Sequence, residues 1–282
     1  NQLRLFHERA LPDLGGNIKC GNSLIGPDFY ENQQLDLLDD EERYRINVFD
    51  LQKEFSEIFK AGGFDAVIGN PPYLRMEAFK ELKNYLRNNY ACHEERSDLY
   101  DYFIERGHKV LRKTGRFGMI VSNKFFRANY GSPLRSFLCK NASFERVTDF
   151  AGVPVFAGAT VRTIVLITRK ENRQARTILY SPPPDTDHFH GLVTGSKSVE
   201  YIFTETAYQV PADSLANQVW SFDVRLSGGS RTLASIQAKT PESRYKAGLV
   251  LIAAATTEFR KVYGCLKNHF PRHRDNASVC FG

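Results

Sequence analysis

The stretch Asn70-Pro71-Pro72-Tyr73 carries the residues best suited to chemistry, and it follows directly on a short apolar run typical of a buried strand. Neither proline can donate to a sheet, and each keeps the residue before it extended, so the chain leaves the sheet as a stiff segment. The Asn70 side chain and the Pro71 main chain each offer a carbonyl oxygen. Two fixed acceptors suit an NH2 group, and the Tyr73 ring offers a flat face for stacking a planar base or amide.

An amino group on an aromatic ring is a poor nucleophile because its lone pair is delocalised into the ring. Two acceptors that hold its hydrogens out of the plane move the nitrogen toward tetrahedral geometry and free the lone pair. Methyl transfer from a sulfonium donor then depends on in-line alignment, for which effective molarities on the order of 10⁵ M are available. Hydrogen bonds that strengthen as positive charge grows on the nitrogen favour the transition state. The pattern therefore predicts methylation of an amino group without a general base.

A structural explanation of the same four residues is that they only end a strand, and a four-residue string has a real false-positive rate. The context favours the catalytic interpretation, because an apolar strand precedes the segment and a helical pattern follows it.

The elements that must position this segment alternate between short apolar strands and helices, which predicts a mostly parallel α/β sheet with right-handed crossovers. The expected strands span 18–25 (with a polar turn), 64–68 (ended by Gly69), 117–121, 144–150 and 162–168, and the expected helices span 48–59, 76–90 and 98–111. The last two strands lie close enough to form an antiparallel edge hairpin. Ligands bind outside the carboxyl ends of parallel strands, where Asn70 falls.

The amino-acid composition excludes few classes of protein. The chain has 282 residues and a net charge of +6, which tolerates an anionic partner without requiring one. Its five cysteines are widely spaced, as in reduced cytosolic proteins, and no apolar run is long enough for a membrane helix. The first residue is Asn1, which suggests a fragment or a processed product.

Several ordered motifs resemble the N6-adenine-specific DNA methyltransferases of the NPPY type, found in restriction–modification and type IIG-like systems of bacteria. The motifs are Ile18 to Leu24 (family pattern G-D/N-S-L), Asn70 to Tyr73, Ser97 to Tyr100 with Phe103, Gly115 to Asn123, and Val155 to Val161. The resemblance covers residues 17–170. It implies a Rossmann-like, S-adenosylmethionine-dependent methyltransferase sheet, and double-stranded DNA as the substrate.

The resemblance also implies residue roles. Asn70, Pro71, Pro72 and Tyr73 would be catalytic, holding the amine of an adenine flipped out of the duplex. Tyr73 and Phe156 would stack on that base, and Asn22 and Asp98 would bind the cofactor. Taken alone, Phe156 fits a core position and Asp98 a helix cap.

Two departures from the family bound the prediction. The glycine-rich cofactor loop is expected upstream of Asn17, where only Gly15-Gly16 stands, so the sheet is expected to be N-terminally incomplete and the chain alone inactive. Residues 1–170 are predicted to form a partial catalytic domain, and 171–282 a linker and the start of a target-recognition region within a partial C-terminal domain. Our hypothesis for the segment from Lys239 onward is that it is divergent or read in a wrong frame, which the underlying nucleotide sequence would test.

Among the charged residues, Lys124, Arg127 and Arg135 follow a strand end that should face substrate, and we predict that they contact DNA phosphates. For these three residues the alternative is a solvated surface position. The basic stretch from Arg260 could also contact DNA phosphates, and the alternative there is a solvated tail. His188 and His190 lack the partners of a metal site, so no metal is predicted.

Three functions remain open from the sequence: DNA adenine methylation, methylation of RNA or protein glutamine, and an inactive DNA-binding remnant. The expected partners are duplex DNA and a restriction or specificity subunit or fused domain, in the cytoplasm and not at a membrane.

Overall fold

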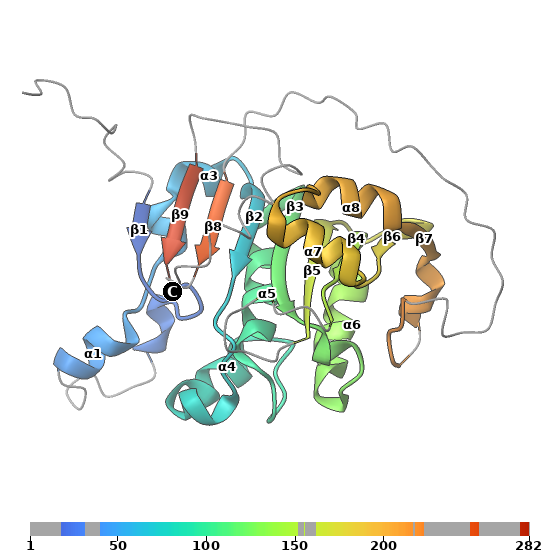
Figure 1. The fold of residues 1–282 in the computed structure, drawn as a ribbon. Helices are drawn as coiled ribbons and strands as arrows, with labels where there is room; N and C mark the ends of the chain where they lie inside the picture. Colours follow the sequence, from blue (N-terminus) through green and yellow to red (C-terminus); the bar gives the residue numbers. More distant parts are fainter. Residues whose placement is uncertain are drawn as a thin grey trace, which may run out of the picture.

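The computed structural model describes residues 18–31, 40–151, 155, 162–216, 218–222, 249–253 and 277–281. These residues contain a nine-stranded mixed sheet in the order β1-β9-β8-β2-β3-β5-β4-β6-β7 (Figure 1). The strands are β1 (Ile18–Cys20), β2 (Phe64–Asn70), β3 (Leu111–Ser122), β4 (Ala142–Asp149), β5 (Thr163–Lys170), β6 (Thr177–Ser181), β7 (Tyr208–Pro211), β8 (Leu249–Ala253) and β9 (Ala277–Phe281).

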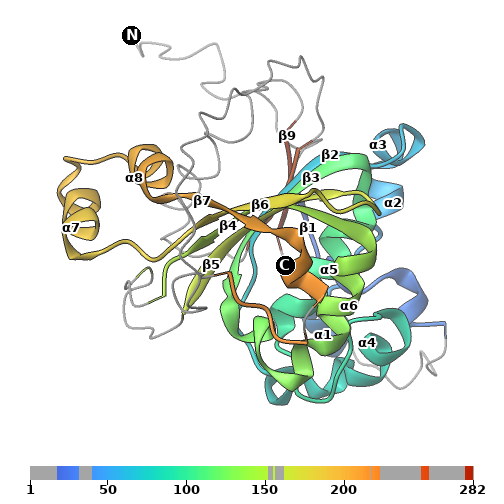
Figure 2. The same cartoon turned by 90° about the vertical axis from the view of Figure 1, so that its right-hand side faces the viewer.

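The α-helices are α1 (Asp40–Ile46), α2 (Leu51–Glu54), α3 (Ser56–Lys60), α4 (Lys83–Asn89), α5 (Leu99–Val110), α6 (Ser132–Asn141), α7 (Thr186–Thr194) and α8 (Val199–Thr206). The 3₁₀ helices are η1 (Pro27–Phe29), η3 (Met76–Leu82), η4 (Asn123–Phe126), η5 (Asn129–Gly131) and η6 (Ala212–Ala216). Figure 2 shows α4, α5 and α6 on one side of the sheet and α7 and α8 on the other.

The five neighbouring strands β1, β9, β8, β2 and β3 are parallel to one another. In contrast, β5 runs antiparallel to both β3 and β4. This arrangement confirms the predicted mixed α/β sheet and the pairing of the two strands expected to form a hairpin. The hairpin is not at the edge, however, because β6 pairs with β4 and β7 pairs with β6. The pattern beyond the Pro182-Pro183-Pro184 turn was too weak to predict β7.

Two strands from the C-terminal part of the chain occupy the sheet positions between β1 and β2. β8 pairs in parallel with β2, from Ala66 opposite Leu249 to Asn70 opposite Ala253, and β9 joins β8 to β1. A parallel strand covered on both faces needs a partner on each edge, because its main-chain groups have no water to bond. β8 supplies that partner for β2, in the sheet that the sequence predicts to be incomplete.

The core lies between the sheet and α5, and a glycine allows the close approach. A side chain at Gly107 of α5 would place its Cβ 2.5 Å from the Phe117 ring and 3.3 Å from Val67, so only glycine fits there. Phe64, Val67 and Phe117 are fully buried and belong to the same hydrophobic cluster as α5. α5 is therefore packed directly on β2 and β3, the strands that lead to the candidate site.

Several predicted element boundaries differ from the observed ones; the strand predicted over 117–121, for example, begins at Leu111 as part of β3. The strand predicted to end at Gly69 continues to Asn70, which pairs with β8. The helix predicted over 48–59 is divided into α2 and α3, because Phe55 adopts a non-helical conformation with φ −123° and ψ 41°. The helix predicted over 76–90 begins as η3 and becomes α-helical only at Lys83, after a kink at Phe79.

Candidate active site

Asn70 is the last residue of β2, at the carboxyl end of the parallel strands, and its side chain is 5% exposed. Its Oδ1 atom is buried and has no hydrogen-bond partner among the described residues. A buried acceptor left unsatisfied costs about 1–3 kcal/mol, so such an atom in a native protein calls for an explanation. An incoming N–H donor is the explanation that suits its place at the strand ends.

The segment after Asn70, residues 71–75, is fixed to the start of α5. The Leu99 N–H donates to the Leu74 carbonyl at 2.8 Å, and Arg75 forms an antiparallel bridge with Asp98. Pro71 is buried, while Leu74 and Arg75 are exposed. The two prolines and this bridge together hold the acceptor segment still from both ends.

Tyr73 is partly buried and its ring lies against an aromatic neighbour from α5. The centroids of Tyr73 and Tyr100 are 6.1 Å apart, and Tyr100 in turn contacts Phe125 of η4 at 6.3 Å. Burial raises the pKa of the Tyr73 hydroxyl, so the ring stays neutral at physiological pH. A neutral ring braced from behind is suited to stacking.

Asp98 caps α5, as predicted, and it lies beside the same segment. The Asp98 N–H donates to the Asp101 carboxylate at 3.2 Å, as in a capping box, and Tyr130 Oη donates to Asp98 Oδ2 at 3.4 Å. Burial raises the pKa of Asp98, and Lys124 of η4 acts in the opposite direction. Asp98 thus joins the start of α5 to the loop after β3, and its predicted cofactor contact stays a prediction.

Two further residues lie beside Asp98, one buried and one half-buried, and neither is predicted as a site residue from the sequence. Asp101 is fully buried, and burial raises its pKa well above the usual value, with the neighbouring Asp98 acting in the same direction. Burial raises the pKa of Tyr130 to about 12. The contact between Tyr130 and Asp98 is made only by the fold, so no local pattern could have revealed it.

Asn22 stands in the turn after β1, also at the carboxyl end of its strand. The Leu24 N–H donates to Asn22 Oδ1 at 3.2 Å, and the Asn22 N–H donates to the Asn47 carbonyl at 2.7 Å. A Cβ at Gly21 would lie 2.4 Å from the Phe49 ring, which explains the glycine before Asn22. Because an N–H must face an acceptor, these contacts identify the side-chain oxygen and leave the Asn22 NH2 group as the donor.

Asn22 and Asn70 do not touch, because β9 and β8 lie between β1 and β2. Three strand spacings of about 4.8 Å place them roughly 14 Å apart along the same edge of the sheet. An extended ligand could span both positions, and a single small group could not.

The three predicted DNA-contacting residues differ in their surroundings. Lys124 and Arg127 are exposed on and just after η4. Arg135 is only 7% exposed, and its Nη1 donates to the carbonyls of Phe125 at 2.6 Å and Ala128 at 2.9 Å. We therefore assign Arg135 a structural role, as a brace for the loop that carries the other two, instead of the predicted DNA contact.

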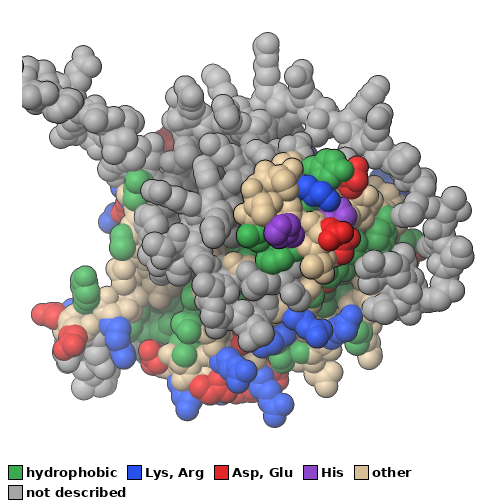
Figure 3. Space-filling view, viewed as in Figure 1, with side chains coloured by type: hydrophobic (Ala, Val, Ile, Leu, Met, Phe, Trp, Pro, Cys, Tyr) green, Lys and Arg blue, Asp and Glu red, His purple; other side chains and the backbone are tan. Residues whose placement is uncertain are grey.

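Basic side chains gather along the lower edge of the molecule in Figure 3, with acidic ones among them. The exposed Arg75 lies two residues after Tyr73 and adds a basic residue that no sequence motif predicted. Phe156 lies outside the described residues. Within the described part of the chain, no cluster of His, Cys, Asp and Glu side chains could hold a metal ion, and no helix is long and apolar enough to cross a membrane.

The described sheet, with the acceptor segment at the carboxyl edge of its parallel strands, is a Rossmann-like mixed α/β domain of the kind found in methyltransferases. Residues 3–156, more than half of the chain, match the model of one family, and the chain belongs to it: the Eco57I restriction-modification methylases.

Relatives of known activity agree with this assignment. The chain is 34% identical over 167 residues to the type II restriction enzyme and methyltransferase RM.Eco57I of Escherichia coli, covering 57% of this chain and 15% of that protein. It is 32% identical over 127 residues to the type II methyltransferase M.PaeR7I of Pseudomonas aeruginosa, covering 44% of this chain and 22% of that one. The chain thus spans less than a quarter of either relative.

Similar solved structures are more distant in sequence. One is the type IIG restriction endonuclease BpuSI, with 19% identity, a TM-score of 0.40, and coverage of 55% of this chain and 20% of that one. Another is the M protein of the type I restriction enzyme EcoKI, with 12% identity, a TM-score of 0.35, and coverage of 58% and 43%.

Proposed function

We propose that this chain carries the catalytic centre of a DNA adenine-N6 methyltransferase that uses S-adenosylmethionine. The observation that supports this most directly is the buried Asn70 Oδ1 at the carboxyl end of β2, which has no hydrogen-bond partner in the part of the chain that the structure describes. Family membership supports the methyltransferase class, and adenine as the target base is the finer part of the proposal.

In this proposal the Asn70 side-chain oxygen and the Pro71 carbonyl accept the two hydrogens of the adenine amine and hold the nitrogen with its lone pair free. Tyr73 stacks on the flipped base, and Phe156 is proposed to contact its other face. Flipping costs a few kcal/mol. Stacking on one aromatic side chain returns about 1–3 kcal/mol, which is the right size to offset it.

The cofactor, when bound, supplies an electrophilic methyl group on a sulfonium ion. We propose that Asn22, through its NH2 group, and Asp98 would hold the cofactor at the carboxyl ends of the strands. The residues of the chain exclude water, fix the amine and accept its hydrogens, and the released proton passes to solvent.

The proposed partners are duplex DNA and a restriction or specificity subunit or fused domain, in the bacterial cytoplasm. Exposed Lys124 and Arg127 are proposed to contact DNA phosphates. Methylation of RNA or of protein glutamine is the second candidate, because any exposed NH2 group could meet the same two acceptors.

The experiment that tests the proposal measures the transfer of labelled methyl groups from S-adenosylmethionine to unmethylated genomic DNA, which contains every recognition sequence. It is run on this chain and on a fusion that adds the glycine-rich segment of a relative upstream. RNA and a glutamine peptide serve as alternative substrates.

We expect DNA to be methylated at adenine N6, and Asn70→Ala to abolish the activity. Asn141→Ala is the matched control, because among the described residues the Asn141 amide donates to the Phe137 carbonyl alone, at the end of α6. Full activity of Asn70→Ala would overturn the residue assignment. Binding of DNA without any binding of S-adenosylmethionine by either protein would favour the non-catalytic remnant.

A further inference from the structure

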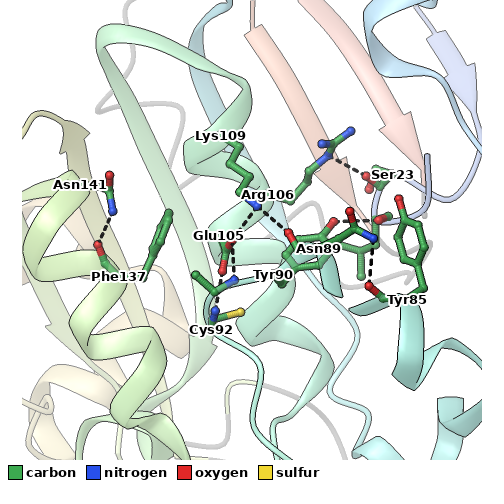
Figure 4. A network of polar contacts seen from close by, with 12 residues as sticks. Ser23, Tyr85, Asn89, Tyr90, Cys92, Glu105, Arg106, Lys109, Phe137 and Asn141 are labelled. Atoms are coloured by element: carbon green, nitrogen blue, oxygen red, sulfur yellow. Dashed lines mark hydrogen bonds and ion pairs between the residues drawn. The ribbon is translucent and has the colours of Figure 1, made fainter. Parts of the chain in front are cut away.

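The turn that contains Asn22, which we define as residues 21–25 and call the Asn22 turn, is held by side chains from α5 and the end of α4. Arg106 Nε donates to the Ser23 carbonyl at 3.0 Å, and Tyr90 Oη donates to the Leu24 carbonyl at 2.8 Å (Figure 4). Two successive carbonyls of the turn are therefore fixed by residues far away in sequence.

The support behind Tyr90 is itself anchored on α5. Glu105 is fully buried, and its carboxylate accepts from the N–H groups of Ala91 at 3.0 Å and Cys92 at 2.7 Å. Lys109 forms an ion pair with Glu105 at 2.7 Å and lies 4.8 Å from the centre of the Tyr90 ring. A buried charge that accepts two amide bonds and is paired one helical turn away is held in one position.

The other end of α5 holds the acceptor segment. The Leu99 N–H donates to the Leu74 carbonyl, and the Tyr100 ring lies against Tyr73. From Leu99 to Arg106 the helix rises about 10 Å. A single rigid helix therefore contacts both the segment proposed to hold the target amine and the turn proposed to meet the cofactor.

We infer that Arg106 and Tyr90 are positioning residues, which set the place of the Asn22 turn relative to the Asn70 to Tyr73 segment. The inference rests on the proposed function, in which the cofactor contacts Asn22. In-line methyl transfer needs the reacting atoms about 3–3.5 Å apart, and a misplacement of about 1 Å can cost on the order of 100-fold in rate. Without the two hydrogen bonds the turn moves independently of the amine.

The test compares Arg106→Met and Tyr90→Phe with matched controls in the protein that shows methyl transfer. Arg116→Met removes a half-buried arginine whose ion pair with Glu145 lies in the sheet. Tyr102→Phe removes a hydroxyl of α5 that bonds to His93 and Ser97 and not to residues 21–25. Arg106→Lys keeps a donor and serves as the conservative variant. Kinetics are measured for both substrates, and amide hydrogen exchange is measured over residues 19–26.

We expect Arg106→Met and Tyr90→Phe each to raise the KM for S-adenosylmethionine about 5–10-fold, as for one lost hydrogen bond, and to lower kcat, with the KM for DNA unchanged. Exchange over residues 19–26 should accelerate in both, the controls should behave as the unmodified chain, and Arg106→Lys should recover part of the effect. A merely structural role would lower the active fraction, and hence kcat, without changing either KM.

An unchanged KM for S-adenosylmethionine in both variants, or unchanged exchange over residues 19–26, would overturn the inference. Failure of the proposed function looks different, because the unmodified protein and all controls would then show no methyl transfer. In that case faster exchange over residues 19–26 in Arg106→Met and Tyr90→Phe, but not in the controls, would still support the conclusion that these two side chains hold the Asn22 turn. Unchanged exchange in both variants would refute that conclusion.

Discussion

His108 Nε2 lies 2.9 Å from Thr168 Oγ1, and this contact joins α5 to β5 in the interior of the protein. The imidazole also packs against Phe117, with the ring centres 4.7 Å apart. Burial, and to a smaller extent Lys170, lowers the pKa of His108 to about 3. The folded protein therefore contains a neutral histidine over most of the accessible pH range.

We predict that His108 makes the protein less stable as the pH falls below about 6.5. The unfolded chain takes up a proton there that the folded chain does not, so this contribution is fully present above 6.5 and decreases toward pH 3. The slope is about 1.4 kcal/mol per pH unit. Denaturant unfolding measured at a series of pH values should approach this slope between about pH 6 and pH 4, and His108→Gln should show less of it. An identical slope in both proteins would contradict the assignment.

Tyr73 should act through its ring and not through its hydroxyl. Tyr73→Phe keeps the stacking face, so methyl transfer to DNA should stay close to that of the unmodified protein. Tyr73→Ala should lose about 1–3 kcal/mol of base binding, seen as a higher KM for DNA. Equal damage by both substitutions would mean that the hydroxyl takes part in the chemistry.

Arg135 should matter for stability, whereas Arg127 should matter for DNA. Arg135→Met removes two charge-assisted bonds to main-chain carbonyls and should lower the free energy of unfolding by about 2–3 kcal/mol. Arg127→Met, on an exposed position, should change it by less than about 0.5 kcal/mol.

DNA binding should be affected by Arg127→Met and not by Arg135→Met, the reverse of their effects on stability. Arg127→Met should reduce the slope of log affinity against log salt by about 1, as for one lost phosphate contact, and Arg135→Met should leave it unchanged. A reduced slope in Arg135→Met, measured on the folded fraction, would restore this residue to the DNA-binding surface.

The pairing of β8 with β2 can be tested by removing main-chain donors. Leu251 lies opposite Ile68 in the middle of β8, and Leu249 is the first residue of that strand. Proline at a strand centre removes a sheet hydrogen bond, and at a strand start it is tolerated. Leu251→Pro should therefore accelerate amide exchange over residues 64–70, and Leu249→Pro should not. Equal exchange in both variants would contradict the observed register.

Local sequence signals predicted the parts of the site that depend on neighbouring residues. The apolar run before Asn70 identified β2, and Asp98 was identified as a helix cap because its side chain suits that position. The kink at Phe55 was missed, since the apolar spacing of residues 48–59 continues through it. Spacing reports which residues face the core and not whether the backbone between them stays helical.

Contacts between distant residues left no such signal. Tyr130 contacts Asp98 only because β3 and the loop after it bring the two residues together. The residues around Arg135 in the sequence are the same whether its side chain contacts DNA or bonds to loop carbonyls, so the sequence could not distinguish these roles. Parallel pairing of β8 with β2 likewise depends on residues that are far apart in the chain. The proposed roles of Asn22, Asn70, Tyr73 and Phe156 come from the motifs, and the experiments above test them.

The position of β8 and β9 between β1 and β2 also has a consequence for biosynthesis. A ribosome adds about 5–20 residues per second, so β2 emerges on the order of ten seconds before β8 exists. During that interval an apolar strand has one open edge, which is a template for pairing with other nascent chains. Chaperone dependence during translation, and aggregation of prematurely terminated chains, would follow from this strand order.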